Sequence, residues 1–279
     1  MAAPDAVQYG SFSVPGQTRG STNATRDEDA RLLVGRKSGY GQRWRGKMVQ
    51  DVRPQWTGAI LLLCYTITGF LDSSSTLTWG TFVSMQTGNT VFLGLGPVSS
   101  DNRWKKSGLS ILAFCLGSFC FGRLHRSISP SPRSRWVLCL AFILQALFST
   151  AAASIVTWGP RAKEQNDASW YVAVPIALIA FQSGGQAMIS RAVKHNALTS
   201  VVLTSIYCDL FSDTELFKPS NPDRNTRVAA PVSLMIGVIA GGLITKSSLG
   251  TAGVLWIVAG IKLLLIVVWL IWPGDEEGA

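Results

Sequence analysis

The chain carries little charge for its length. Only 15% of its 279 residues are charged, whereas soluble globular domains carry about 25%. The shortage is uneven, because residues 1–53 alone hold nine Lys or Arg residues and five acidic residues. Beyond residue 53 the chain alternates between apolar runs and short polar breaks, and its mean hydropathy is +0.27 over the whole length. This pattern excludes an ordinary water-soluble core and is typical of a polytopic α-helical membrane protein.

Histidine and paired cysteine are also scarce. The two histidines, His125 and His195, have no partner at metal-ligand spacing. The five cysteines all lie in or beside apolar runs, and no two of them form a CxxC motif. An odd number of such cysteines argues against a disulfide framework or a zinc site. We therefore expect neither a metal nor another cofactor.

Catalytic sequence motifs are absent as well. The chain lacks GxSxG, HExxH, a P-loop and a dinucleotide-binding glycine pattern, so we expect no catalytic residues and no enzymatic activity. The net charge of +9 suggests a nucleic-acid partner, but no DNA- or RNA-binding motif accompanies it. The basic residues cluster beside apolar segments, where they set topology and meet anionic lipid. The predicted partner is therefore the lipid bilayer, with no nucleic acid.

Apolar segments dominate the rest of the chain. Eight can be drawn, at 56–72, 80–96, 107–124, 136–158, 170–190, 197–212, 228–247 and 250–272. A spanning helix needs about 20 apolar residues, and the second and sixth segments are short with polar centres. The sequence therefore predicts an all-α, polytopic transmembrane helical bundle of six to eight membrane segments over 54–272, in two repeated halves at about 54–160 and 165–272.

The two ends of the chain differ from this helical domain. Residues 1–53 are basic and rich in small polar residues, which predicts a disordered tail, and residues 273–279 form a short acidic tail. The positive-inside rule places the N-terminus in the cytosol. Lys and Arg counts in the remaining loops do not separate six spans from eight, and nothing in the sequence indicates which membrane holds the protein.

An internal repeat is indicated by a shift of 110 residues. This shift places Asp72-Ser73 over Gln182-Ser183, and Asn89-Thr90 over Thr199-Ser200, without a gap in the short segments. Shared membrane composition is the alternative explanation. If the two short segments cross the membrane, the halves are parallel; if they are re-entrant, the halves are inverted, and both arrangements occur in transporters.

Polar residues inside apolar segments mark the candidate site. Asp72 ends the first segment, where it is either a helix-end carboxylate or an ion or proton site, because a charge inside the bilayer is costly. Gly88 permits a break in the second segment that would free backbone groups at membrane depth, although helix–helix hydrogen bonding by Asn89 is an equal alternative. The predicted polar or transport site consists of Asp72, Gln86, Thr87, Gly88, Asn89, Gln182, Gln186 and Thr199.

Small residues at a spacing of four predict close helix packing. Gly80 and Ser84 would share one helix face with Gly88, and Gly237 and Gly241 form a GxxxG spacing. Lys262 lies inside the last apolar segment, and its predicted partners are Asp72 or Asp209, because a buried lysine needs a counter-charge.

A family resemblance lies in two motifs, Gly69-Phe70-Leu71-Asp72 and Thr87-Gly88-Asn89, the second preceded by a stretch that contains phenylalanine. In these motifs the chain resembles the YoaK-like family of polytopic membrane proteins, whose domain has no established function. The element from Gln182 to Gln186 is similar to a second family element, although Gln186 is followed by Ala187 where the family often has Asn. The resemblance covers about residues 53–272, and the basic tail looks like a fungal-type extension. The resemblance implies a membrane fold and a shared polar motif, but it does not indicate a substrate.

Two functions are compatible with these features. The first is a transporter or channel-like protein for a small solute or ion that passes the polar site at the interrupted segments. The second is a non-transporting structural or partner-binding membrane protein, whose small polar residues only pack helices. Homo-oligomerisation is left open in both.

Overall fold

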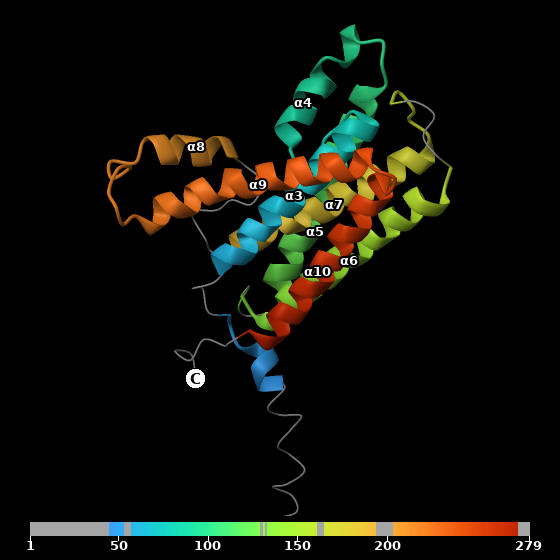
Figure 1. The fold of residues 1–279 in the computed structure, drawn as a ribbon. Coiled ribbons are helices and arrows are strands. Elements are labelled where there is room, and N and C mark those ends of the chain that lie inside the picture. The colour runs from blue at the N-terminus through green and yellow to red at the C-terminus, as the bar shows by residue number, and fades with distance from the viewer. Residues whose placement is uncertain are drawn as a thin grey trace, which may run out of the picture. The chain divides into compact units, whose positions relative to one another are not determined.

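The computed structural model describes residues 45–52, 57–128, 131, 133–160, 165–193 and 203–272. Two compact units divide the chain, Met1–Gly46 and Lys47–Ala279, and the helices labelled in Figure 1 all belong to the second. Most of the predicted N-terminal tail, the acidic tail after 272 and the candidate residue Thr199 lie outside the described residues.

The described part of the chain is helical and contains no β-strand, which confirms the predicted all-α class. Its elements are α3 (Thr57–Trp79), α4 (Gln86–Gly94), the short 3-10 helix η2 (Gly96–Val98), α5 (Arg103–Ser127), α6 (Arg135–Trp158), α7 (Trp170–Ala192), α8 (Leu203–Phe211), α9 (Pro222–Lys246) and α10 (Gly250–Ile271).

Six of these helices are long and apolar enough to cross a membrane: α3, α5, α6, α7, α9 and α10. They contain 22 to 25 residues, or about 33 to 38 Å at 1.5 Å per residue, which matches a hydrocarbon core of about 30 Å. Helices α4 and α8 have nine residues each and rise only about 13 Å. Among the described residues, then, the two short segments do not form spanning helices.

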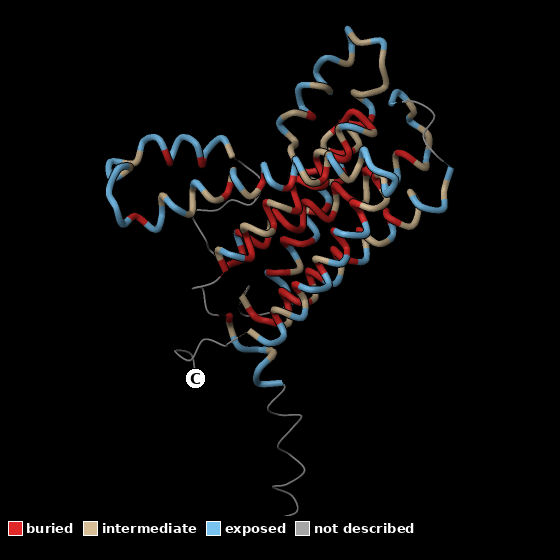
Figure 2. Tube along the Cα trace, viewed as in Figure 1, coloured by how far each residue is buried: buried red, intermediate tan, exposed pale blue. Residues whose placement is uncertain are grey.

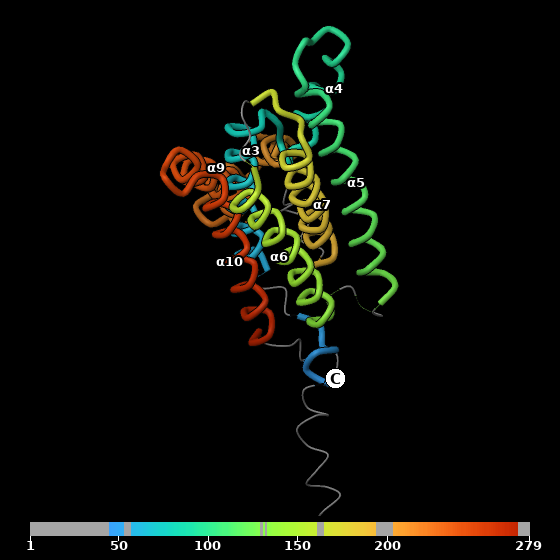
Figure 3. Tube along the Cα trace, turned by 90° about the vertical axis from the view of Figure 1, so that its right-hand side faces the viewer, coloured from blue at the N-terminus to red at the C-terminus, as the bar shows by residue number. Residues whose placement is uncertain are grey.

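The long helices pack in a crossed pattern. Helix α3 packs mainly against α9, α7 against α5, and α6 against α10, while α6 also contacts α7 (Figures 1 and 3). Two of these contacts are close backbone approaches made by glycine. A Cβ atom at Gly237 of α9 would overlap the backbone of Thr66, and one at Gly117 of α5 would overlap the backbone of Phe181. Gly241 approaches Phe70 in the same way, so the GxxxG pair of α9 lies at the contact with α3.

The other predicted packing face does not exist. Gly80 follows Trp79, the last residue of α3, and has a φ of +73°. Residues 80–85 are not helical, so Gly80 and Ser84 cannot share a helix face with Gly88. The positive φ is a conformation that side-chain-bearing residues avoid. Gly80 and Ser84 therefore lie in a turn and a loop, and their spacing of four residues does not reflect a helix face.

Burial is concentrated where four helices meet. Figure 2 shows buried residues along α3, α6, α7 and the facing side of α10, whereas α8 and much of α9 are exposed. The exposed side chains of α9 include Met235, Ile236, Ile239 and Leu243. Apolar side chains on the outside of a long helix are what a lipid-facing surface requires.

Candidate functional site

The chain folds back into the bundle after α3. Beyond the turn at Gly80, the carbonyl oxygen of Thr81 accepts a hydrogen bond from Ser75 Oγ at 2.8 Å. Ser84, three residues further along, contacts Asp72, which lies about two helical turns before the end of α3. Residues 81–85 therefore run back alongside α3 before α4 begins at Gln86 and leaves again (Figure 1).

Asp72 holds this returning segment. Its side chain is buried, with 2% of the residue exposed. Its Oδ1 atom accepts hydrogen bonds from the backbone N–H of Val83 at 2.8 Å and of Ser84 at 2.9 Å, and its Oδ2 atom accepts one from the Ser84 hydroxyl. Non-helical backbone away from water needs such partners, so the carboxylate replaces the hydrogen bonds that a helix would have supplied.

Asn89, in the first turn of α4, holds the other end of the same segment. Its Oδ1 accepts hydrogen bonds from Thr81 Oγ1 at 2.8 Å and from the N–H of Phe82 at 3.1 Å. Its Nδ2, with two N–H donors, lies within hydrogen-bond distance of three acceptors: the carbonyl oxygen of Phe82 at 2.8 Å, Gln86 Oε1 at 2.9 Å and Ser110 Oγ of α5 at 3.1 Å. The amide thus links α4 to a neighbouring helix, which was one of the two predicted alternatives. The other, a break at Gly88, is wrong, because Gly88 lies within α4 and the non-helical residues are 80–85.

The remaining residues of the Thr87-Gly88-Asn89 motif lie beside a pocket. A Cβ atom on Gly88 would lie 2.7 Å from the ring of Phe82, so glycine allows that ring to pack on α4. Thr87 is exposed and lines a pocket of about 340 Å³. The other lining residues come from the returning segment, α4, α5, α7 and the start of α8: Phe82, Ser84, Met85, Gln86, Gly88, Phe114, Ala187, Arg191, Leu203 and Thr204.

A second polar network crosses the middle of the bundle. Lys262 of α10 is fully buried and donates hydrogen bonds to Gln145 Oε1 of α6 at 2.7 Å and to Gln186 Oε1 of α7 at 2.9 Å. Gln186 Nε2 donates in turn to Thr68 Oγ1 and to the carbonyl oxygen of Cys64, both on α3 and both at 3.0 Å. One lysine and one glutamine therefore connect four helices.

The predicted ion pair of Lys262 is wrong. Asp72 is engaged by the returning segment, and Asp209 is exposed on α8. In the part of the chain that the structure describes, the hydrogen-bond partners of Lys262 are neutral amides and no carboxylate lies within ion-pair distance. Sequence spacing could not reveal Gln145, a lone polar residue in an apolar run, as the partner.

The two networks meet on α3. Thr68 belongs to the Lys262 network, and Asp72 holds the returning segment four residues later, on the same helix face. Of the predicted site residues, Asp72, Gln86 and Asn89 lie in one network and Gln186 in the other. Gln182 is buried beside them on α7 and donates to Ser183 Oγ at 3.0 Å. Thr81, Ser107 and Ser110 were not predicted, because isolated hydroxyl residues are common in membrane helices.

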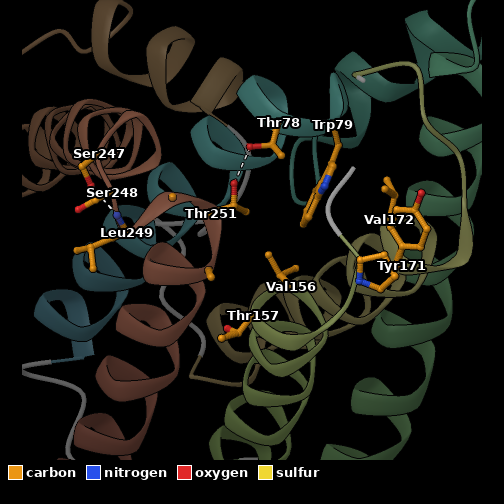
Figure 4. A pocket seen from close by; sticks show the side chains of 13 residues that line it. Thr78, Trp79, Val156, Thr157, Tyr171, Val172, Ser247, Ser248, Leu249 and Thr251 are labelled. Carbon is orange, nitrogen blue, oxygen red and sulfur yellow. Dashed lines mark hydrogen bonds between the residues drawn. The ribbon is translucent and has the colours of Figure 1, made fainter. Parts of the chain in front are cut away.

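A larger pocket, of about 520 Å³, opens at one end of the bundle (Figure 4). It is formed by the ends of α3 and α6, the start of α7 and the turn between α9 and α10. Trp79 and Tyr171 supply aromatic walls, and Thr78 and Thr251 are hydrogen-bonded across one side at 2.6 Å. The described residues contain no group of three His, Cys, Asp or Glu side chains placed to hold a metal ion.

This geometry defines a class of protein: a polytopic helical membrane protein with a buried polar centre and a returning, non-helical segment. The model of one protein family matches residues 60–268, that of a protein of unknown function designated DUF1275. The chain belongs to this family. Neither the curated proteins nor the solved structures contain a significant match.

Proposed function

We propose that this protein is a transporter or channel-like protein for a small solute or ion, with its polar site at the interrupted segment 80–94. The observation that carries the proposal is the non-helical backbone of residues 81–85, which Asp72 and Asn89 hold inside the bundle. Irregular backbone at membrane depth is tolerated where it is buried in protein or lines a watery cavity. The pocket of about 340 Å³ beside Thr87 is the corresponding cavity.

The arrangement of the two halves supports the proposal. Helices α3 and α7 have 23 residues each, α4 and α8 nine, and α5 and α9 25. The helix contacts show the same correspondence between the halves. Helix α3 of the first half packs on α9 of the second, and α7 of the second half packs on α5 of the first. With three long helices in each half, we infer an inverted repeat. Transporters of this kind place the substrate site at the interrupted helices.

The alternative of a non-transporting structural protein also has a supporting observation. The polar atoms of Asp72 and Asn89 all bond to their own chain. In that case the two residues would only stabilise the fold, and the pocket beside Thr87 would be closed to water.

Water accessibility separates the two proposals. Single cysteines are introduced at Thr87 and at Leu112, an exposed apolar position of α5, in a background without the five native cysteines. A charged, membrane-impermeant maleimide should label Thr87→Cys and leave Leu112→Cys unlabelled until the protein is solubilised. Protection of both positions in the membrane would reject the watery pocket and favour the structural protein.

Blocking the pocket tests the transport step itself. Thr87→Trp should fill the pocket and reduce solute flux at least tenfold in proteoliposomes, with little change in thermal stability, because Thr87 is exposed. Thr90→Trp is the matched control, since Thr90 is exposed on the same helix and does not line the pocket. Equal flux through both variants and the unsubstituted protein would contradict the proposed site.

A further inference from the structure

Among the residues that the structure describes, Lys262 presents a buried positive charge without a counter-charge. The residue is fully buried, and its two hydrogen-bond acceptors are the amide oxygens of Gln145 and Gln186. The ring of Phe142 also faces it, with the ring centroid 5.8 Å from Nζ. Among the described residues, the thiol of Cys64 on α3 is a titratable group that interacts with it electrostatically. Ammonium groups inside a membrane protein are costly and mark sites of function when no carboxylate neutralises them.

In the described part of the chain, two hydrogen-bond donors, one on Lys262 and one on Gln145, are left without an acceptor. A lysine ammonium has three N–H donors, and two of them are used. Gln145 is fully buried, and its Nε2 atom has no hydrogen-bond partner, although the Oε1 atom of the same amide accepts from Lys262. Buried donors without acceptors carry a free-energy penalty, and an acceptor with one negative charge would satisfy both donors and the charge together.

The pocket of Figure 4 lies on the same four helices. Its lining residues Thr251 on α10 and Val156 on α6 are each 11 positions from Lys262 and Gln145, respectively. Thr78 lies ten positions beyond Thr68 on α3. At 1.5 Å per residue these separations are about 15 to 17 Å along each helix. The pocket and the lysine therefore occupy successive levels of one four-helix axis.

We propose that Lys262 and Gln145 form the central binding site for a small monovalent anion, which enters through the pocket of Figure 4. This inference rests on the proposed transport function and names its substrate class. It adds a second polar site, whose network meets that of the interrupted segment on α3. Lys262 supplies the charge and one N–H donor, and Gln145 Nε2 supplies a second donor. Gln186 positions the lysine by accepting a hydrogen bond from its ammonium, and Thr68 of α3 accepts one from Gln186 in turn. The anion replaces the missing counter-charge during its passage.

The test is solute flux through proteoliposomes that contain the full chain. Chloride, nitrate and acetate are the anionic probes, methylammonium is the cationic probe and glycerol is the neutral probe. We expect the unsubstituted protein to conduct at least one of the three anions and to exclude methylammonium. Lys262→Gln should reduce that anion flux at least tenfold, whereas Lys262→Arg should retain part of it. Lys246→Gln, which removes an exposed lysine at the end of α9, should leave it unchanged.

The outcomes separate this inference from the function on which it rests. Flux of glycerol or methylammonium without anion flux, or anion flux that Lys262→Gln leaves intact, would overturn the anion site while transport stands. A proton flux without any anion would also overturn it and would assign Lys262 to proton transfer. No flux of any probe would count against both proposals. If Lys262→Gln does not fold, the ion selectivity of the unsubstituted protein and the flux through Gln145→Leu still decide the question.

Discussion

Asp72 and Ser84 are joined by two hydrogen bonds across twelve residues of sequence. The carboxylate of Asp72 accepts from both the backbone N–H and the hydroxyl of Ser84. A third bond, from the N–H of Val83, completes the set. A carboxylate that binds two consecutive backbone N–H groups fixes the local direction of the chain, so Asp72 determines where the segment after α3 turns back.

Asp72→Ala should therefore destabilise the protein far more than Asp72→Asn. Alanine leaves two buried backbone N–H groups without an acceptor, at a cost of about 1 to 3 kcal/mol each. Asparagine keeps one oxygen in the place of Oδ1 and should melt close to the unsubstituted protein. Thermal unfolding in detergent measures the difference. Equal melting temperatures for the two variants would show that the returning segment does not depend on Asp72.

Gly237→Ala should loosen the contact of α3 and α9. The added methyl group would overlap the backbone of Thr66, and overpacking of this kind costs about 1 to 3 kcal/mol. Gly242→Ala on the same helix is the control, because the nearest atom to its Cβ would be Leu77 Cδ1 at 3.8 Å. Both changes are measured by thermal unfolding. If Gly242→Ala lowers the melting temperature as much as Gly237→Ala does, the loss comes from a change within α9 and not from its contact with α3.

Lys262 and Gln145 should show strong energetic coupling. Gln145→Leu removes an acceptor from a buried ammonium and should cost about 2 to 3 kcal/mol. Lys262→Met replaces the charge by an apolar chain of similar length and should cost less. The double variant should be more stable than the sum of the two single effects predicts, as a double-mutant cycle measures. Strict additivity would mean that the hydrogen bond of 2.7 Å contributes nothing.

The turn between α8 and α9 should loosen in acid. Hydrogen bonds from the backbone N–H of Glu215 and from Asn221 Nδ2, with Arg227 nearby, lower the pKa of Asp213 below its ordinary value. Because the folded-state pKa is depressed, the stabilisation is present above the ordinary Asp pKa of about 3.9 and is lost as the pH falls through the lower, folded-state value. Hydrogen exchange of residues 209–227, corrected for the intrinsic rate, should rise over that range. Asp213→Asn should abolish this pH dependence of hydrogen exchange. If the variant shows the same pH dependence as the unsubstituted protein, Asp213 is not the group responsible.

Both ends of the helical unit should face the cytosol. Arg135, at the start of α6, donates hydrogen bonds to the carbonyl oxygens of Lys47 at 2.8 Å and Trp272 at 2.6 Å, so the start of the unit and the end of α10 lie together. The positive-inside rule assigns the basic N-terminal segment to the cytosol. A fluorescent protein fused after residue 279 should therefore fluoresce, and an epitope between 159 and 169 should be exposed on the opposite side. The reverse result would invert the topology.

Several features of the fold were predictable from composition and periodicity. Apolar runs of about 20 residues predict spanning helices because the bilayer leaves no other partner for their backbone groups. The two short runs with polar centres correspond to α4 and α8, the two helices of nine residues. Several candidate residues were also predictable, because Asp72, Asn89 and Gln186 are polar residues inside apolar segments, where contact with lipid is unfavourable.

Contacts between distant segments could not be predicted in this way. The spacing of Gly80 and Ser84 suggested a helix face, but a left-handed turn at Gly80 and the carboxylate of Asp72 broke that helix. Lys262 was predicted to pair with an aspartate, but in the folded bundle it donates hydrogen bonds to two glutamines. Hydrogen-bond partners depend on which helix faces are brought together, and apolar helices of similar composition do not encode that choice locally.

The sequence by itself determined the class of the protein, a range of six to eight membrane segments, and the polar residues at its centre, because each follows from the cost of placing polar groups in lipid. Only the tertiary structure decided that Asp72 and Asn89 organise a returning segment, and that Lys262 is a buried charge among amides. Those assignments depend on which helices pack together, α3 with α9, α7 with α5 and α6 with α10. The close backbone approaches at glycine and the hydrogen bonds join residues that are far apart in the sequence, so no local pattern records them.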